Sequence, residues 1–340
     1  MKKKDINDLI KNYQVNESPL MLYDLSQLKL NIQKLLFLKT KYNVEFLFPV
    51  KAFPEYKVLK LFFDFGFGYD IANENEFNTI DKIINKDTLI SFNGTPTISN
   101  KKEYNNIIYN LNSLNELTNK TFYNGIRINT YIKNKTEFSK FGIPIEKIKS
   151  INNKKIKSIS FHFYEENKKK KLKHILNFAR KCITIFKNLD YINFGGNWDV
   201  IDVSNFERNI IEIRKYIDNK IKIIFEVGEN WFENCGYLVT KVISTNEISN
   251  KKIFYINAGK DSVAKWSVLK PVNLEYEKED KFTYIISGNS CYEKDIFTVT
   301  NKKVNISIND KIVFVGLNGY SYAWCKEFNG SNSPEVIFYE

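Results

Sequence analysis

Short apolar runs alternate with amphipathic segments over the first two thirds of the chain. Residues 19–23 (PLMLY) predict a strand, and Asp24 follows as a good helix N-cap. Apolar residues spaced three and four apart then predict a helix over about 25–40. The run 46–52 (FLFPVKA) predicts the next strand, and a helix over about 54–64 follows it. The chain therefore begins as a strand, helix, strand, helix series.

Seven further apolar runs continue this alternation. They are residues 68–72, 88–92, 107–111, 125–129, 156–163, 191–195 and 221–228. Together with residues 46–52 they make eight predicted strands, separated mostly by segments of helical length. Eight successive strand–helix units predict a closed parallel (β/α)8 barrel, whose reactive groups lie at the C-terminal ends of the strands.

The pattern changes after about residue 233. The runs YLVTKVIS, KIFYIN, FTYIIS, IFTVT and KIVFVG are rich in β-forming residues, are separated by turn residues and show little helical periodicity. We therefore predict an α/β fold with two domains. A (β/α)8 barrel covers residues 25–232, and residues 1–24 and 233–340 form a second, all-β domain.

The composition is that of a globular protein, with 43% hydrophobic residues among 340. No apolar stretch approaches the about 20 residues that span a bilayer, and the N-terminal residues lack the apolar core of a signal peptide, so we expect a cytoplasmic protein with no membrane partner. The net charge is +12, but the excess is dispersed lysine, which favours solvated faces over a nucleic-acid surface. The four cysteines and two histidines show no metal-ligand spacing, so neither a metal site nor a disulfide framework is expected.

Polar residues and glycines gather at the predicted strand ends. A lysine at the end of a buried strand either escapes to solvent or is used covalently, since burying an ammonium is costly. The strand ends carry Lys51, Asp70, Arg127, His162, the pair Gly195–Gly196 and Glu226. A cation, a carboxylate, an aromatic base and a glycine turn at one barrel mouth favour the covalent use of Lys51 as a Schiff base.

Several motifs, in the correct order, resemble one family. FPVKA, FGYDIANENEF, SISFHF, INFGG, FEVGE, SGNSCYEKD and GYSYAWCKEFNG are spaced over almost the whole chain, from residue 19 to residue 330. They resemble the barrel-type, alanine racemase-like decarboxylases that use pyridoxal 5'-phosphate (PLP), including the ornithine, diaminopimelate and carboxynorspermidine decarboxylases. A series of spaced motifs is far more specific than any one of them.

The resemblance implies the roles of the cofactor-binding residues. PLP would be held on Lys51 as an internal aldimine, and Glu226 would face the ring nitrogen and keep it protonated. His162 would stack on the ring. Backbone N–H groups of Gly195 and Gly196 would approach the phosphate.

The resemblance also implies further contacts and a partner. Tyr320 would add a hydroxyl near the phosphate, and Asp70 and Arg127 would lie near the cofactor. Cys291 would donate a proton to the substrate's α-carbon after decarboxylation. In this family that cysteine acts across a dimer interface, so a homodimer that shares its two active sites is expected.

Departures from the family pattern bear on the substrate. Tyr164 and Glu165 follow the stacking histidine where other branches have Gly-Ser, and Glu229 stands where they have arginine. Glu166 and Glu229 match the patterns of the carboxynorspermidine branch. Tyr292 stands where the ornithine branch has an aspartate that binds the distal amine. Glu166, Glu229 and Tyr292 are therefore the candidate substrate contacts.

We accordingly expect a decarboxylase for a small-molecule amino acid with a long polar or cationic side chain, similar to carboxynorspermidine or carboxyspermidine, or with an aminocarboxypropyl group. Three alternatives stay open. The first is a decarboxylase of the ornithine, lysine or diaminopimelate type. The second is a PLP-dependent amino-acid racemase, and the third is a non-catalytic regulator that keeps the decarboxylase fold.

Overall fold

The computed structural model describes residues 12–94, 106–119, 123–131, 138–151, 154–163 and 168–340. The chain forms two compact units, one of residues 32–231 and one of residues 1–31 with 232–340. The first boundary falls inside helix α2 (Leu25–Tyr42). Among the described residues, no helix is long and apolar enough to cross a membrane.

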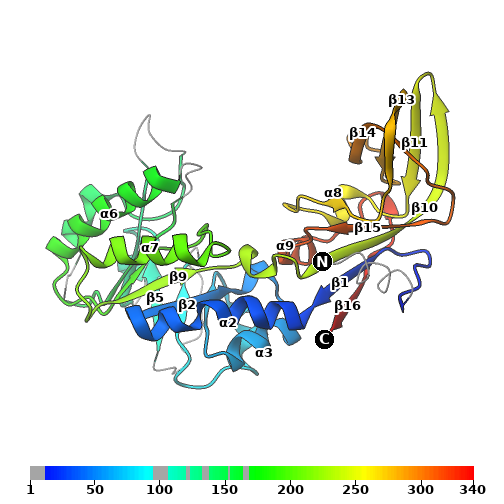
Figure 1. Ribbon diagram of the computed structural model, residues 1–340. Coiled ribbons are helices and arrows are strands. Elements are labelled where there is room, and N and C mark those ends of the chain that lie inside the picture. Colours follow the sequence, from blue (N-terminus) through cyan, green and yellow to red (C-terminus); the bar gives the residue numbers. More distant parts are fainter. Residues whose placement is uncertain (1–11, 95–105, 120–122, 132–137, 152–153, 164–167) are drawn as a thin grey trace. The chain divides into compact units, whose positions relative to one another are not determined.

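The unit of residues 32–231 is a closed barrel of eight parallel strands, as predicted. Figure 1 shows helices lying around these strands. Its strands are β2 (Val44–Pro49), β3 (Gly68–Ile71), β4 (Ile90–Phe92), β5 (Ile107–Leu111), β6 (Gly125–Ile128), β7 (Ser158–Phe161), β8 (Tyr191–Asn193) and β9 (Lys222–Glu226). Strand β9 closes the barrel against β2, with Glu226 opposite Leu47. Most strands are shorter than predicted because the apolar runs continue past the ladder. Phe163, for example, is buried beyond the end of β7.

Helices connect the barrel strands. Besides α2 they are α3 (Tyr56–Asp64), α4 (Glu74–Ile80), α5 (Glu116–Asn119), α6 (Lys168–Ile185) and α7 (Val203–Arg214), with short 3-10 helices η1 (Val50–Ala52), η2 (Ile145–Ser150) and η3 (Glu229–Phe232). Asp24 accepts a hydrogen bond from the backbone N–H of Gln27 at 2.8 Å, which confirms the predicted cap. Helix α3 begins at Tyr56 rather than at residue 54, because Glu55 is extended and caps the helix through its side chain.

Aromatic side chains fill the space between β2 and its flanking segments. Phe46, Phe62 and Phe67 surround Trp231 with ring centroids 5.4–5.9 Å apart, and the indole N–H of Trp231 donates to the carbonyl of Val227 at 2.7 Å. Edge-to-face contacts at such distances stabilise a core beyond the area they bury. This packing supports the segment that follows β9 at the barrel mouth.

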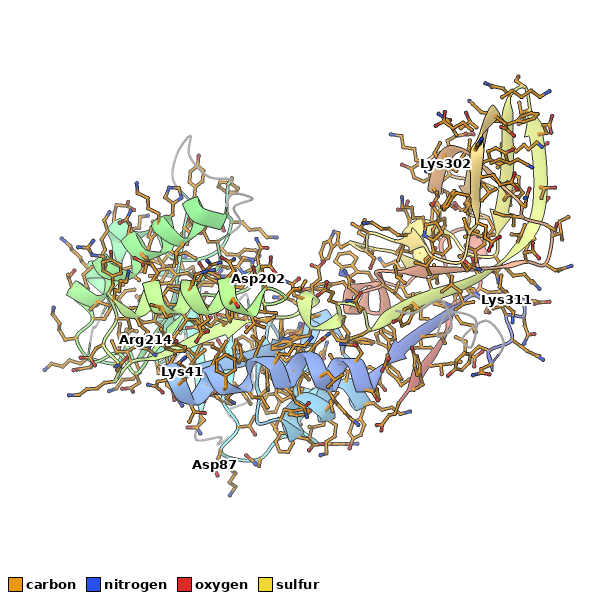
Figure 2. The ribbon with its side chains drawn as sticks, in the orientation of Figure 1. Lys41, Asp87, Asp202, Arg214, Lys302 and Lys311 are labelled. Carbon is orange, nitrogen blue, oxygen red and sulfur yellow. The ribbon has the colours of Figure 1, made fainter. Side chains whose placement is uncertain are left out.

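Arg214, labelled in Figure 2, joins the end of α7 to neighbouring segments. Its guanidinium donates to four backbone carbonyls at 2.8–3.0 Å, those of Tyr42, Asn43, Asp218 and Ile221. Carbonyls at helix ends otherwise lack partners. Arg214 therefore satisfies carbonyls at the end of α2 and holds the backbone at Ile221, just before β9.

The second unit is built on a mixed eight-stranded sheet. Its strands are β1 (Leu20–Asp24), β10 (Gly236–Ile248), β11 (Lys251–Ile256), β12 (Lys270–Pro271), β13 (Tyr276–Ser287), β14 (Ile296–Val304), β15 (Lys311–Val315) and β16 (Glu335–Tyr339), with short helices α8 (Lys260–Val263), α9 (Gly319–Ala323) and η4 (Phe328–Gly330). Residues 20–24 join this sheet: β1 pairs antiparallel with β10 and parallel with β16.

Candidate active site

Lys51 lies immediately beyond the first barrel strand. The prediction placed it in that strand, and this detail was wrong: β2 ends at Pro49, and Lys51 is in the turn η1. Its side chain is 50% exposed, so the turn places the amine at the mouth and spares it the cost of burial. The amine Nζ lies 3.5 Å from Oδ2 of Asp70, whose side chain is only 4% exposed. The barrel therefore pairs an accessible amine with a buried carboxylate.

Asn93 joins the two buried carboxylates of the mouth. Its amide Nδ2 donates to Asp70 Oδ1 at 2.7 Å and to Glu226 Oε1 at 2.8 Å. Its backbone carbonyl accepts a hydrogen bond from the Arg127 guanidinium at 3.1 Å. Asn93 follows β4 directly, so one residue connects side chains from β3, β6 and β9. The structure thus brings together Lys51, Asp70, Arg127 and Glu226.

Glu226 occupies an environment that makes its ionisation costly. Burial, followed by the negative charge of Asp70, raises the pKa of Glu226 to about 7, while Lys51, the hydrogen bond from Asn193 and Arg127 act in the opposite direction. Burial lowers the pKa of Arg127, and the two carboxylates oppose that effect. Lys51 and Arg127 are thus the cationic neighbours that balance Asp70 and Glu226.

Gly195 is required by the backbone geometry after β8. Its φ is +65°, and a Cβ there would stand 2.2 Å from the carbonyl oxygen of Phe161. The N–H of Gly195 donates to Asn193 Oδ1 at 2.8 Å, and its carbonyl accepts from the N–H of Glu226 at 3.0 Å. Both of its backbone groups are therefore engaged within the protein, so Gly195 shapes the turn.

His162 lies beside this turn. A Cβ on Gly196 would meet the carbonyl oxygen of Glu226 at 2.9 Å and Cε1 of His162 at 3.7 Å. The backbone carbonyl of His162 accepts from the hydroxyl of Thr130 at 3.0 Å, and the residue is exposed at the end of β7. Gly196 thus lies close to both the Glu226 carbonyl and the His162 ring, and a side chain at residue 196 would collide with the carbonyl.

An amide and hydroxyl network below the carboxylates was missed by the sequence analysis. The hydroxyl of Ser91 accepts hydrogen bonds from Asn93 at 3.0 Å, Asn110 at 3.2 Å and Asn193 at 3.4 Å. A signal was available, because Ser91, Asn110 and Asn193 interrupt apolar barrel strands and are buried. Buried polar groups need partners, so polar residues inside such strands indicate an internal network.

Cys291 and Tyr292 belong to the other unit, in the turn between β13 and β14. Cys291 is exposed, and its N–H donates to the Asn329 side chain at 3.2 Å. The buried carboxylate of Asp295 organises the turn by accepting from the N–H of Lys260 at 2.8 Å, and from the N–H and hydroxyl of Ser290 at 3.1 and 2.5 Å. Asp295 thereby holds the loop that presents the thiol.

Tyr320 also lies in the β-sheet unit, on α9. Its ring meets that of Trp266 edge to face at 5.1 Å. Asn318 caps this helix by accepting from the N–H of Ser321 at 3.2 Å, and its side-chain amide donates to the carbonyl of Trp266 at 3.0 Å. Helix α9 and the segment at Trp266 therefore form one supported structure.

Two predicted substrate contacts remain. Glu229 is the first residue of η3, shortly after β9, and it is exposed. Glu166 lies outside the described residues. Among the described residues, no group of three or more histidine, cysteine or acidic side chains could hold a metal ion.

The barrel residues fit PLP. An accessible amine suits an aldehyde, and a buried carboxylate suits a ring nitrogen. Because Gly195 and Gly196 have no Cβ atoms, the turn packs closely against the carbonyl oxygens of Phe161 and Glu226. The fit therefore rests on the amine of Lys51, the carboxylate of Glu226 and the backbone of the glycine turn.

Comparisons with known proteins agree with this fit. Residues 20–316 match the family model described as pyridoxal-dependent decarboxylase, C-terminal sheet domain. The carboxynorspermidine/carboxyspermidine decarboxylase of Campylobacter jejuni is 22% identical over 219 residues, 59% of this chain and 57% of that protein. The chain therefore spans little more than half the length of this curated relative.

Solved structures resemble the whole chain. The arginine decarboxylase of Paramecium bursaria Chlorella virus, bound to agmatine, has a TM-score of 0.83 at 18% identity and covers 99% of this chain and 100% of its own. The lysine/ornithine decarboxylase of Vibrio vulnificus, complexed with putrescine, has a TM-score of 0.79 at 16% identity, covering 100% and 99%. At such identities the similarity establishes the fold.

Proposed function

Because the chain belongs to the pyridoxal-dependent decarboxylase family, and is thus a PLP-dependent carboxy-lyase of the basic amino-acid type, we propose that it decarboxylates an amino acid with a long polar or cationic side chain. The observation that carries the proposal is the joining of Lys51, Asp70 and Glu226 at one barrel mouth through Asn93.

Each group in the barrel then has a role toward the cofactor. Lys51 would bind the aldehyde, and Glu226 would hold a proton at the ring nitrogen. His162 would cover the ring face, and the turn at Gly195 and Gly196 would receive the phosphate. When bound, PLP supplies an electron sink for the electron pair left at the α-carbon as CO₂ departs.

Charge balance explains why Asp70 and Arg127 belong to this site. Asp70 orients the amine of Lys51 at 3.5 Å and stabilises its positive charge. Arg127, held by the Asn93 carbonyl, offsets the negative charge of Glu226. The two cations offset the two carboxylates. The site therefore has no excess negative charge that would repel a dianionic phosphate or a substrate carboxylate.

Groups of the β-sheet unit complete the proposed reaction. The exposed thiol of Cys291 would donate a proton to the α-carbon once CO₂ has left, which gives the amine product, and Tyr320 would contribute a hydroxyl near the phosphate. We place Cys291 in the active site of the partner chain of a homodimer, so that both copies build each site. The exposed position of the thiol and its firmly held loop support this role.

The substrate end is proposed from the acidic residues. Glu229 is exposed just beyond β9, where a carboxylate attracts the distal cation of a long side chain. Glu166 and Tyr292 are the other proposed contacts. The similarity to the relative from C. jejuni supports a carboxylated polyamine as the substrate of this chain.

The test is a reaction panel analysed by mass spectrometry. Purified protein is incubated with PLP and with L-ornithine, L-lysine, L-arginine, diaminopimelate or carboxynorspermidine, and loss of CO₂ is scored. We expect turnover of a substrate with a distal cation, and none with Lys51→Ala. A Glu229→Gln variant should raise KM more than it lowers kcat. Protein that binds PLP but converts no member of the panel would contradict the proposed substrate class.

A further inference from the structure

Asn193 connects the two ends of the proposed cofactor site. It is the last residue of β8 and is only 1% exposed. Its Oδ1 accepts the N–H of Gly195 at 2.8 Å, and its Nδ2 donates to Oε1 of Glu226 at 2.6 Å. One short side chain thus contacts both the turn proposed for the phosphate and the carboxylate proposed for the ring nitrogen.

The direction of these two hydrogen bonds is fixed. The N–H of Gly195 can only donate, so the atom of Asn193 that faces it must be the oxygen. The NH₂ group of Asn193 therefore faces Glu226, which has to accept. Because Asn93 also donates to the same atom at 2.8 Å, Oε1 of Glu226 accepts two hydrogen bonds. A proton shared with a ligand must then be held on Oε2.

The backbone makes the same connection. The N–H of Glu226 donates to the carbonyl of Gly195 at 3.0 Å, so Asn193, Gly195 and Glu226 form a closed ring of hydrogen bonds. A displacement of the turn therefore moves the carboxylate with it. We infer that Asn193 is a positioning residue that couples the phosphate turn to Glu226 and presents Oε2 to the cofactor ring.

The neutrality of Asn193 matters for this role. Asp70 and Glu226 are already two buried acids in contact with Asn93. A third carboxylate at residue 193 would repel both of them and the N–H donor to Glu226 would be lost. A carboxylate at residue 193 could still accept the N–H of Gly195, so the substitution would act mainly on Glu226.

The test uses Asn193→Asp and Asn193→Ser. Each apoprotein is titrated with PLP to obtain a dissociation constant, and the visible absorption of the bound cofactor is followed from pH 5 to 9. We expect the dissociation constant to rise about tenfold or more in N193D, and the pH midpoint of the spectrum to rise by about one unit. N193S removes the amide donor without adding charge, so its midpoint should lie between those of the wild type and N193D.

Asn124 supplies the matched control. It accepts the N–H of Tyr109 at 2.8 Å and donates to the carbonyl of Ile107 at 2.9 Å, just before β6 and away from the strand ends that carry the site. Asn124→Asp should lower the melting temperature but leave the PLP dissociation constant and the pH midpoint unchanged. The inference is overturned if N193D and N193S keep the wild-type affinity and midpoint, or if N124D shifts both equally.

The inference rests on the proposed function only for the cofactor's place in the barrel. Both readouts concern cofactor binding and not turnover, so they remain informative if the substrate panel fails. A wild-type protein that does not bind PLP would contradict the proposed cofactor site itself. If N193D does not fold, N193S together with N124D gives the same comparison.

Discussion

Glu226 is a buried acid whose protonation state should govern the stability of the apoprotein. Its folded pKa is raised from 4.5 to about 7 by burial and by Asp70. A raised acid pKa contributes stability that is complete below pH 4.5 and is lost as the pH rises through 7. The shift corresponds to about 3 kcal/mol as an order of magnitude.

Glu226→Gln removes this titration while keeping an oxygen that accepts from Asn93 and Asn193. We therefore expect the unfolding free energy of the wild-type apoprotein to fall between pH 4.5 and 7 relative to that of E226Q, by roughly the amount above. Urea unfolding of both proteins at several pH values measures the difference. Parallel pH profiles for the two proteins would contradict a raised pKa at Glu226.

The turn after β8 depends on a glycine, because Gly195 combines a φ of +65° with a close carbonyl at 2.2 Å from an added Cβ. Gly195→Ala should cost about 1–2 kcal/mol from the left-handed backbone alone, and more from the collision with Phe161. The collision displaces the turn, so PLP affinity should fall at least tenfold.

Gly66 provides a control in the same unit. Its φ is +72°, but the nearest atom to an added Cβ is the flexible Lys39 Nζ at 3.8 Å. Gly66→Ala should therefore be destabilised by the backbone conformation only, with unchanged PLP affinity, as measured by thermal melting and cofactor titration. Equal losses of PLP affinity in both variants would show that the turn has no special part in binding.

The loop that carries Cys291 depends on Asp295, a buried acceptor for the N–H groups of Lys260 and Ser290. In Asp295→Asn, one oxygen becomes an NH₂ group that faces donors, at a cost of about 1–3 kcal/mol. Amide hydrogen exchange at Ser290 should then accelerate at least tenfold. Asp310→Asn, at an exposed turn where the carboxylate accepts from the N–H of Ser307, should leave exchange at Ser290 unchanged. Slow exchange at Ser290 in both variants would refute the anchoring role.

The strand and helix series was predictable because periodicity and caps are local properties. The eight barrel strands and the cap at Asp24 follow from spacing along the chain. The bonds of Asn93 and Asn193 were not predictable, because they join strands far apart in sequence. The place of Lys51 beyond the strand was also missed, since an apolar run does not reveal that its last residues leave the ladder as a 3-10 turn.

Part of the lysine content of the chain lies in ion pairs at the surface. Lys41 pairs with Glu207, Lys215 with Glu212 and Lys303 with Glu277, all with at least one exposed partner. Such pairs contribute little to stability individually. The interpretation of the net charge of +12 as solvated surface stays a prediction.

The proposed homodimer with shared sites makes a quantitative prediction for mixed variants. Lys51→Ala and Cys291→Ala should each be inactive or nearly so, because one lacks the amine and the other the proton donor. In a mixed dimer, one site would receive both defects and the other would have a native Lys51 and a native Cys291. Random exchange makes half of the dimers mixed, so the mixture should recover about a quarter of wild-type activity.

The measurement is activity after the two purified variants are unfolded together and refolded in equal amounts, with each variant refolded alone as the control. Recovery near a quarter requires that the two residues act in different chains of one site. If Cys291 acted within its own chain, a mixed dimer would have one defect in each site and no activity would return. The result therefore shows whether the thiol at each site comes from the same chain as Lys51 or from the partner chain.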